Sequence, residues 1–248
     1  MTTFAARLAG LAATALLLLA ALGAATQDPQ VSARLVAVTA VIGLLAPLFW
    51  PGRAGTRRLT AARIIGWSLA ATLLAGVAAL FSGVGVAWIS HTVAVCAVLF
   101  LVLVVVHAAA VVLESLLHGR TKQADGARET AAWLVTTALV TVAAAPLWLG
   151  PAAELASASR PQAVDAAVAV SPLTHLAVAS GNDLLRNQWF YQHSNLSGLR
   201  FDYPRLAPLM TAYSLLAAAL LIVPAVLPAR GRPVARTRRI PSTQEPRS

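Results

Sequence analysis

Charged residues are scarce in this chain: they make up 11% of its 248 residues, whereas hydrophobic residues make up 58%. A water-soluble domain of ordinary composition carries about 25% charged residues. Too few polar side chains are present to cover a water-facing globule of this size, which excludes a soluble globular fold. The apolar surface must meet lipid instead, so the composition predicts a membrane protein.

Cysteine and lysine are almost missing. Cys96 is the only cysteine, which excludes a disulfide within the chain and any cysteine-based zinc or iron–sulfur site. Lys122 is the only lysine beside many arginines, a balance that, together with abundant alanine, is typical of GC-rich bacterial genomes. The chain also lacks a G-x-x-x-x-G-K-[ST] phosphate loop and the D-D-x-x-D and H-E-x-x-H patterns of membrane enzymes. We therefore expect no cofactor and no catalytic residues.

Long apolar runs dominate the sequence. A membrane-spanning helix needs about 20 apolar residues. The runs predict an all-α, polytopic transmembrane domain over 1–228 with about six helices, followed by a basic, disordered cytoplasmic tail over 229–248. The fourth run would be about 48 Å long at 1.5 Å per residue, so it must tilt or project from the membrane. The expected spans are 5–25, 31–50, 62–81, 86–117, 130–150 and 207–228.

The first run has two interpretations. Arg7, the leucine-rich stretch after it and the small residues at 23–25 also fit a cleaved signal peptide. We expect the first run to be retained as a span, because the basic segments between the other five spans then all lie on one side of the membrane.

The basic residues predict the orientation. With six spans, the segments around 51–63 and 118–129 and the tail share one side with Arg7, and that side carries the whole net charge of +10. By the positive-inside rule this side is cytoplasmic. Both termini then lie in the cytoplasm of a bacterial inner (plasma) membrane, and 151–206 lies outside. The charge is thus a topology signal, and nucleic acid is not expected as a partner.

The segment 171–206 interrupts the alanine, valine and leucine background and is expected to be an ordered external segment before the last helix. Ser171 and Pro172 fit the N-cap and first position of a short helix, and Gly181 fits its end. Asn182 is expected to cap a second short helix with Leu185 and Trp189 on one face. Candidate site residues of the segment are Ser171, Pro172, His175, Asp183, Arg186, Trp189, His193, Arg200 and Asp202.

The aromatic residues 189–191 favour two compatible interpretations of this segment. They can anchor it at the membrane interface, or they can belong to a compact cap that shapes a substrate exit or docks a partner. A hydrolytic site is a third possibility, but the spacing of its candidate residues matches no known pattern; these are His175, Asp183, His193 and Ser194.

Ionisable residues in the fourth run are candidate functional groups, because such groups are costly inside a membrane. Cys96, His107, Glu114 and His118 project onto one helix face, and His91 lies roughly opposite. Glu114 and His118 lie near the cytoplasmic end, where side chains reach water. His107 is expected to hydrogen-bond a neighbouring helix, since a haem would need a second histidine from another span.

The cytoplasmic segment 51–63 also carries a pattern. Thr56 is an N-cap candidate for a short interfacial helix. A plain basic loop that obeys the positive-inside rule explains the same arginines. The candidate residues for docking a cytoplasmic partner are Arg53, Gly55, Thr56, Arg57 and Arg58.

Two motifs and the span plan resemble the permease subunits of ATP-binding-cassette exporters of the ABC-2 type. Gly55, Thr56 and Leu59 match the family's x-x-G-T-L-x-x-L cytoplasmic segment. Ser171, Pro172, Leu173 and Thr174 match the start of its external region before the last span. The resemblance implies six spans, a re-entrant external region, a separate ATPase subunit on the cytoplasmic face and a homodimer or heterodimer of permeases.

Three functions compete on the sequence alone. The chain is expected to be a transport subunit. The alternatives are a non-transporting anchor or assembly component of an envelope or redox complex, and a membrane-embedded enzyme, which the missing motifs disfavour.

Overall fold

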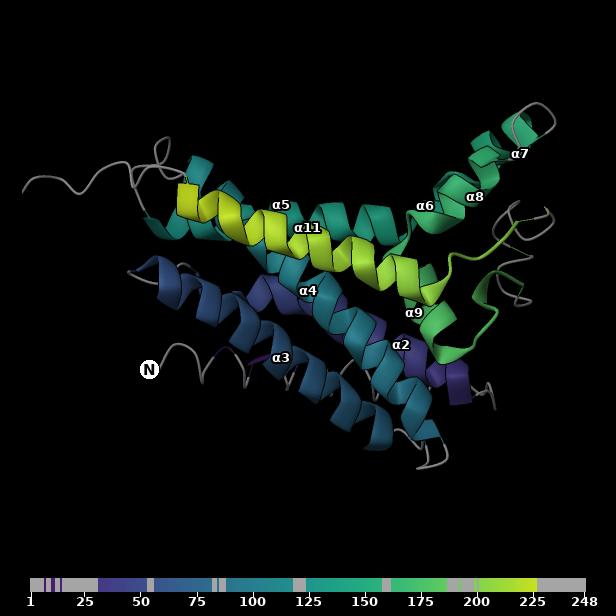
Figure 1. Cartoon of the computed structure of the whole chain (residues 1–248), viewed down its shortest axis with the longest axis horizontal. Coiled ribbons are helices and arrows are strands. Elements are labelled where there is room, and N and C mark those ends of the chain that lie inside the picture. Colours follow the sequence, from purple (N-terminus) through teal and green to yellow (C-terminus); the bar gives the residue numbers. More distant parts are fainter. Residues whose placement is uncertain are drawn as a thin grey trace, which may run out of the picture.

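A computed structural model describes residues 7, 10, 11, 14, 31–52, 56–81, 84, 88–117, 124–157, 162–186, 192, 199 and 201–226. All regular structure in these residues is helical. The helices α2, α3, α4, α5 and α11 lie along the long axis of the molecule, and short helices gather at one end of it (Figure 1).

Four helical segments are long and apolar enough to cross a membrane: Val31–Phe49, Arg58–Phe81, Ile89–Leu117 and Leu206–Val223. They correspond to α2 (Val31–Leu45) with the 3₁₀ turn η1 (Ala46–Phe49), and to α3 (Arg57–Phe81), α4 (Ile89–Leu117) and α11 (Leu206–Val226). Four of the six expected spans are therefore supported. The expected first span, 5–25, lies almost wholly outside the described residues.

The expected fifth span was wrong in its bounds. Helix α5 covers Ala124–Ala143, starting and ending several residues earlier than 130–150, and it is not among the four apolar segments. The polar start at Arg128 and Glu129 lowers its hydropathy. Pro146 then stands at the beginning of a separate four-residue helix, α6 (Ala145–Trp148). A proline has no N–H for an i−4 carbonyl and clashes with the preceding turn, so α5 cannot continue through it.

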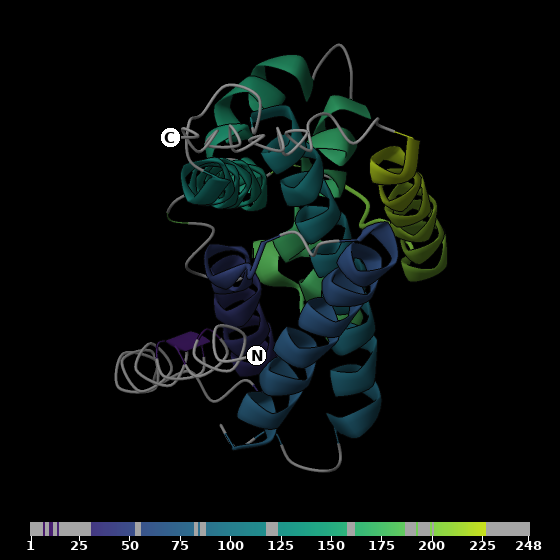
Figure 2. The ribbon, with the colours of Figure 1, turned by 90° about the vertical axis from the view of Figure 1, so that its left-hand side faces the viewer.

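Helix α4 forms the centre of the bundle. It packs against α2, α3, α5, α9 (Pro172–Ser180) and α11, and it runs obliquely across them (Figures 1 and 2). Buried side chains occur all round it, from Val95 and Leu103 to Val104 and Val111. A helix that is apolar on every face is expected to be surrounded by protein. This position accommodates the 29-residue length that the sequence marked as unusual.

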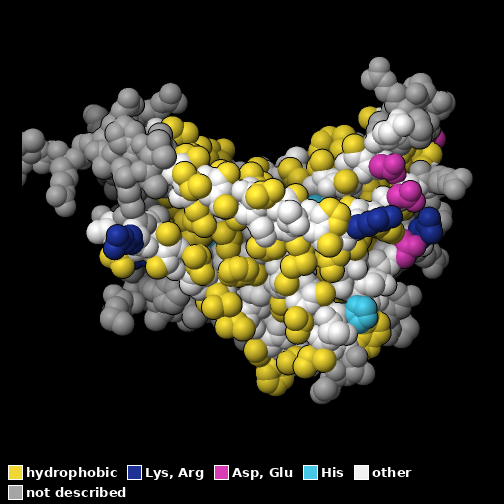
Figure 3. All heavy atoms as spheres, in the orientation of Figure 1, with side chains coloured by type: hydrophobic (Ala, Val, Ile, Leu, Met, Phe, Trp, Pro, Cys, Tyr) yellow, Lys and Arg dark blue, Asp and Glu magenta, His cyan; other side chains and the backbone are white. Residues whose placement is uncertain are grey.

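Helix α3 has one face buried against the bundle and one face exposed on the outside of it. Its inward face carries Ala71, Ala75 and Ala79, all fully buried, whereas its outward face carries Leu69 and Leu73, both about half exposed or more. Small residues let two helix backbones approach closely, which is how membrane helices associate. The outward side chains contribute to the apolar surface that dominates the face seen in Figure 3.

A small second core lies beside the bundle. It includes the helices α7 (Gly150–Ser157) and α8 (Gln162–Ala169), neither of which the sequence had indicated. They project from the end of the molecule near α6 (Figure 1). Val164, Val168, Leu185 and Phe201 form the buried centre of this core.

Candidate functional site at helix α9

Helix α9 has the ends that the sequence predicted. Ser171 has the extended backbone of an N-cap residue, Pro172 follows in the first turn, and Gly181 closes the helix in the left-handed conformation with φ of 68°. The N–H groups of Gly181 and Asn182 donate to the carbonyls of Val178 and Ala177. This pairing satisfies carbonyls in the last turn that have no partner within the helix.

The helix is wedged among the long helices. It packs against α2, α4, α5 and α11, and Thr174, Ala177 and Ser180 have no exposed surface. The Ser171 hydroxyl does not cap α9 as expected. It donates instead to the carbonyl of Ala143, the last residue of α5, at 2.7 Å. The start of α9 is therefore fixed to the end of α5.

His175 connects α9 to the last long helix. Its Nε2 lies 2.8 Å from the carbonyl oxygen of Ala169, and its Nδ1 lies 2.8 Å from the hydroxyl of Tyr213 in α11. A carbonyl can only accept, so Nε2 carries the proton and donates to it. In the neutral ring Nδ1 then accepts from Tyr213. Burial lowers the pKa of His175, and the Ala169 carbonyl opposes that shift, so the neutral form fits the site.

The end of α9 is held by two further contacts. Asn182, which was expected to cap a second helix, makes a contact between helices: its Nδ2 donates to the Ser32 hydroxyl of α2 at 2.9 Å. His91 of α4, half-buried and 5.1 Å from the ring of Trp88, also leans against this turn. A Cβ at Gly181 would come within 3.2 Å of the His91 ring.

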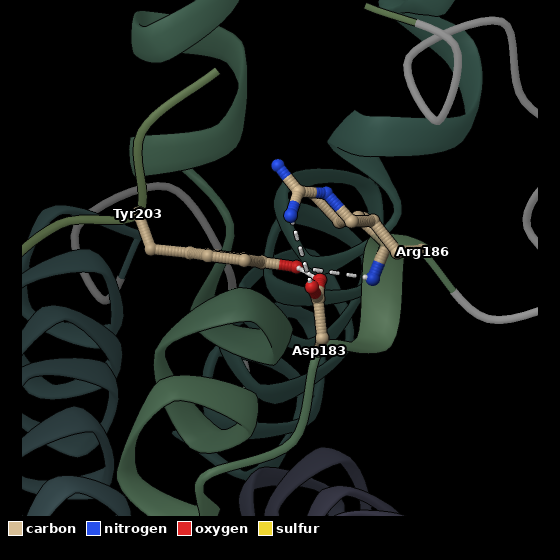
Figure 4. Close-up of polar contacts among 4 residues, drawn as sticks. Asp183, Arg186 and Tyr203 are labelled. Carbon is tan, nitrogen blue, oxygen red and sulfur yellow. Dashed lines mark hydrogen bonds and ion pairs between the residues drawn. The ribbon is translucent and has the colours of Figure 1, made fainter. Parts of the chain in front are cut away.

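A polar triad follows α9. It includes residues next to and within the 3₁₀ turn η3 (Leu184–Arg186), and residues 187–191 of the predicted second helix lie outside the described residues. Asp183 accepts a 2.6 Å hydrogen bond from the Tyr203 hydroxyl and lies 3.5 Å from the Arg186 guanidinium (Figure 4). Burial, followed by the hydrogen bond to Asp183, raises the pKa of Tyr203. The triad joins the α9–η3 loop to the chain that enters α11.

Other candidates of the segment 171–206 are only partly placed. Asp202 is exposed, and its backbone N–H donates to the Asp165 side chain at 2.9 Å. Leu185 is fully buried in the second core. The candidates outside the described residues are Trp189, His193 and Arg200.

The candidates of the fourth run occupy different surroundings. His107 is fully buried and bonds Ser68 of α3 at 2.9 Å, which matches the expected link between helices. Cys96 lies against α3 and is half-buried. Glu114 was expected to reach water, and this was wrong: it is 8% exposed and lies beneath the turn at Gly52. His118 lies outside the described residues.

The expected docking segment is the first turn of α3. The Thr56 hydroxyl accepts from the Leu59 N–H at 3.3 Å, as predicted for an N-cap. The helix continues without a break to Phe81, so the separate interfacial helix was wrong in its described part. Arg58 is exposed at this end, and Arg57 is placed by its backbone alone. Arg53 and Gly55 lie outside the described residues.

Sequence reasoning missed the partners of these residues. Tyr213 is the only tyrosine within its apolar run, and that isolation was an available signal. Ser32 and Ser68 gave no signal, because an isolated serine in a membrane helix can equally bond its own backbone.

The contacts at α9 are hydrogen bonds and packing contacts that hold neighbouring helices together. Among the described residues no group of three or more His, Cys, Asp and Glu side chains is placed to hold a metal ion. The arrangement can hold α9 among α2, α4, α5 and α11 through hydrogen bonds. Such bonds can break and form again with other partners, because they are not covalent. No family model, curated protein or solved structure matches this chain.

Proposed function

We propose that this chain is the membrane-spanning permease subunit of an ATP-binding-cassette exporter, in which a separate cytoplasmic ATPase subunit supplies the energy. The observation that carries the proposal is the position of α9. A short helix, bounded by Ser171 and Gly181 and buried among α2, α4, α5 and α11, precedes the last apolar segment, α11. Such a segment can obstruct a path between the helices and clear it by a small displacement.

The residues that carry the family resemblance also shape this helix. Ser171 and Pro172 begin it, and the Thr174 hydroxyl bonds the carbonyls of Val168 and Ser171 at 2.8 and 2.9 Å. Of the two matching motifs, the one at 171–174 therefore lies at positions with a structural task.

The opposite end of the bundle supports docking of a partner. Thr56 caps α3 and so fixes the direction in which the helix begins. Arg58 is exposed there, where its guanidinium can pair with carboxylates of an ATPase subunit. The same face would be cytoplasmic by the charge distribution.

The test is purification of the tagged chain from its native membrane, followed by identification of bound proteins. Arg57→Gln with Arg58→Gln should reduce recovery of an ATP-binding-cassette subunit several-fold, while the amount of inserted chain stays constant. Arg205→Gln, an exposed arginine at the opposite end, is the matched control and should retain the subunit. Full recovery with the double variant, or no such subunit with the unmodified chain, would refute the proposal.

A membrane anchor or assembly component of an envelope or redox complex is the second candidate. Helix α5 favours it, because its exposed face carries Trp133, Thr137 and Thr141 and is less suited to lipid than the four apolar segments. A face with hydroxyl groups and large aromatic rings suits contact with another membrane protein. In the purification described above, a stable complex without an ATPase would support this function.

A further inference from the structure

A second polar site lies inside the bundle, away from α9. The His107 ring of α4 bonds the Ser68 hydroxyl on one side and stacks on Trp50 on the other, with ring centroids 5.1 Å apart. Both rings have no exposed surface. The carbonyls of Ala46 and Leu103 also lie near the imidazole.

Two polar atoms of this site have no hydrogen-bond partner among the described residues. They are the Nε1 of Trp50 and the Nε2 of His107. Buried polar atoms in folded proteins are almost always bonded, to protein or to ordered water. Leaving them unbonded costs more than immobilising a water molecule.

Trp67 shows that a buried indole near the 3₁₀ turn η1 can find a hydrogen-bond acceptor. It is as fully buried as Trp50, yet its Nε1 donates to the carbonyl of Ala46 at 3.1 Å. The Nε1 of Trp50 has no such partner among the described residues.

The turn that carries Trp50 leads to the end of the bundle where Arg63 and Arg128 lie, which we call the basic end. Arg7 donates to the carbonyl of Trp50, and Arg63 donates to the carbonyl of Gly52 at 3.0 Å. Gly52 has φ of 82°, and a Cβ there would lie 2.7 Å from Arg128 and 3.9 Å from the Glu114 carboxylate. Charged groups therefore continue from the His107 site to the surface.

We infer that ordered internal water occupies the site formed by Trp50 and His107, and that it connects the His107 imidazole past the Trp50–Gly52 turn to the basic end. The donor and acceptor pattern fits water. The indole can only donate, which disfavours a cation. Water both donates and accepts, so it satisfies Nε2 in either tautomer.

The connection would give a buried imidazole a route for exchanging protons with one side of the membrane. That role is independent of the proposed transport function, because it depends on the interior of α3, α4 and η1 and not on α9 or on an ATPase.

The test compares two indoles in one protein. The chain is labelled with ¹⁵N-tryptophan, reconstituted in lipid nanodiscs and transferred to D₂O, and single Trp→Phe variants assign the signals. The Nε1–H of Trp50 should exchange at least about tenfold faster than that of Trp67, since only Trp50 contacts exchangeable water. Equal rates, or rapid exchange of both indoles, would overturn the inference.

A second measurement tests the connection to the basic end. Glu114→Leu removes the buried polar group on that route and should slow exchange at Trp50 at least about threefold, while Glu129→Leu, at an exposed glutamate of the same end, should leave it unchanged. Slow exchange of the Trp67 Nε1–H in each variant shows that the fold is intact. If Glu114→Leu does not fold, Glu114→Gln replaces it. An unchanged rate at Trp50 in the folded Glu114 variant would refute the connection.

Discussion

The imidazole of His175 and the phenol of Tyr213 are joined by a 2.8 Å hydrogen bond, with the two rings packed edge to face at 5.5 Å. The contact joins α9 to α11 across 38 residues of sequence. Helix α11 is the most peripheral of the long helices, and its outer side chains, such as Leu215, are exposed (Figure 2). A directional bond therefore contributes much of the specificity of this contact.

Tyr213→Phe should lower the stability of the protein. The substitution keeps the ring and removes only the donor for His175 Nδ1, so the expected cost is about 1–2 kcal/mol. The measurement is the midpoint of thermal unfolding in detergent micelles. Thr211→Val is the control, because that hydroxyl is exposed and bonds only the Ala207 carbonyl in its own helix. Equal shifts in the two variants would contradict a role for the bond.

Gly181→Ala should destabilise α9. A residue with a Cβ pays about 1–2 kcal/mol in the left-handed conformation, and here the Cβ would also press on the His91 ring at 3.2 Å. Gly66→Ala in α3 is the matched control, since nothing lies within 4 Å of the added Cβ and alanine favours a helix. The midpoint should fall for Gly181→Ala and stay constant or rise for Gly66→Ala.

The stability of the protein should fall at acidic pH partly through His175. Its pKa in the folded chain is lowered from the ordinary value of 6.5 by burial. The unfolded chain therefore binds a proton there before the folded chain does. The contribution of the neutral ring is complete above pH 6.5 and is lost as the pH falls toward the folded value.

The measurement is the unfolding midpoint at pH 7.5 and pH 5 for the natural chain and for His175→Gln. Glutamine can bond the same partners but does not titrate, so the variant should lose less stability between the two conditions. The contribution of every other group is common to both proteins. An identical loss would show that His175 does not titrate with unfolding.

Orientation can be measured with cysteine labelling, because Cys96 is the only cysteine. In a Cys96→Ala background, Arg58→Cys and Arg205→Cys place one thiol at each end of the bundle, at the start of α3 and just before α11 (Figure 1). The positive-inside rule predicts that a membrane-impermeant maleimide labels position 205 in intact cells and position 58 only after permeabilisation. The reverse pattern would invert the topology and place the docking segment outside.

The ends of helices were predictable where a single residue type determines them. Ser171, Pro172 and Gly181 delimit α9, and Thr56 caps α3, because caps depend on the backbone of a few neighbouring residues. The same local chemistry also explains the error at α5. Pro146 ends the helix, and the apolar run was extended across it only because hydropathy does not register a missing N–H.

The partners of polar side chains could not be predicted in the same way. Asn182 has a nearby helix start that it could cap, yet it bonds Ser32, 150 residues away in sequence. Glu114 lies near a helix end, yet the Gly52 turn and the Arg128 side chain cover it. Which of two available partners a side chain takes depends on which helices are neighbours.

The sequence by itself determined that the chain is helical, that it carries long apolar segments and that most of its basic residues gather in loops and a tail, since these properties follow from local composition. Only the tertiary structure decided that α4 is central, that α9 lies among four helices and that Trp50 covers His107. The reason is that lipid and an alanine- and valine-rich helix interface are equally apolar, so hydropathy cannot distinguish a lipid-facing residue from a buried one. Shape and hydrogen bonding make that distinction, and both require the folded chain.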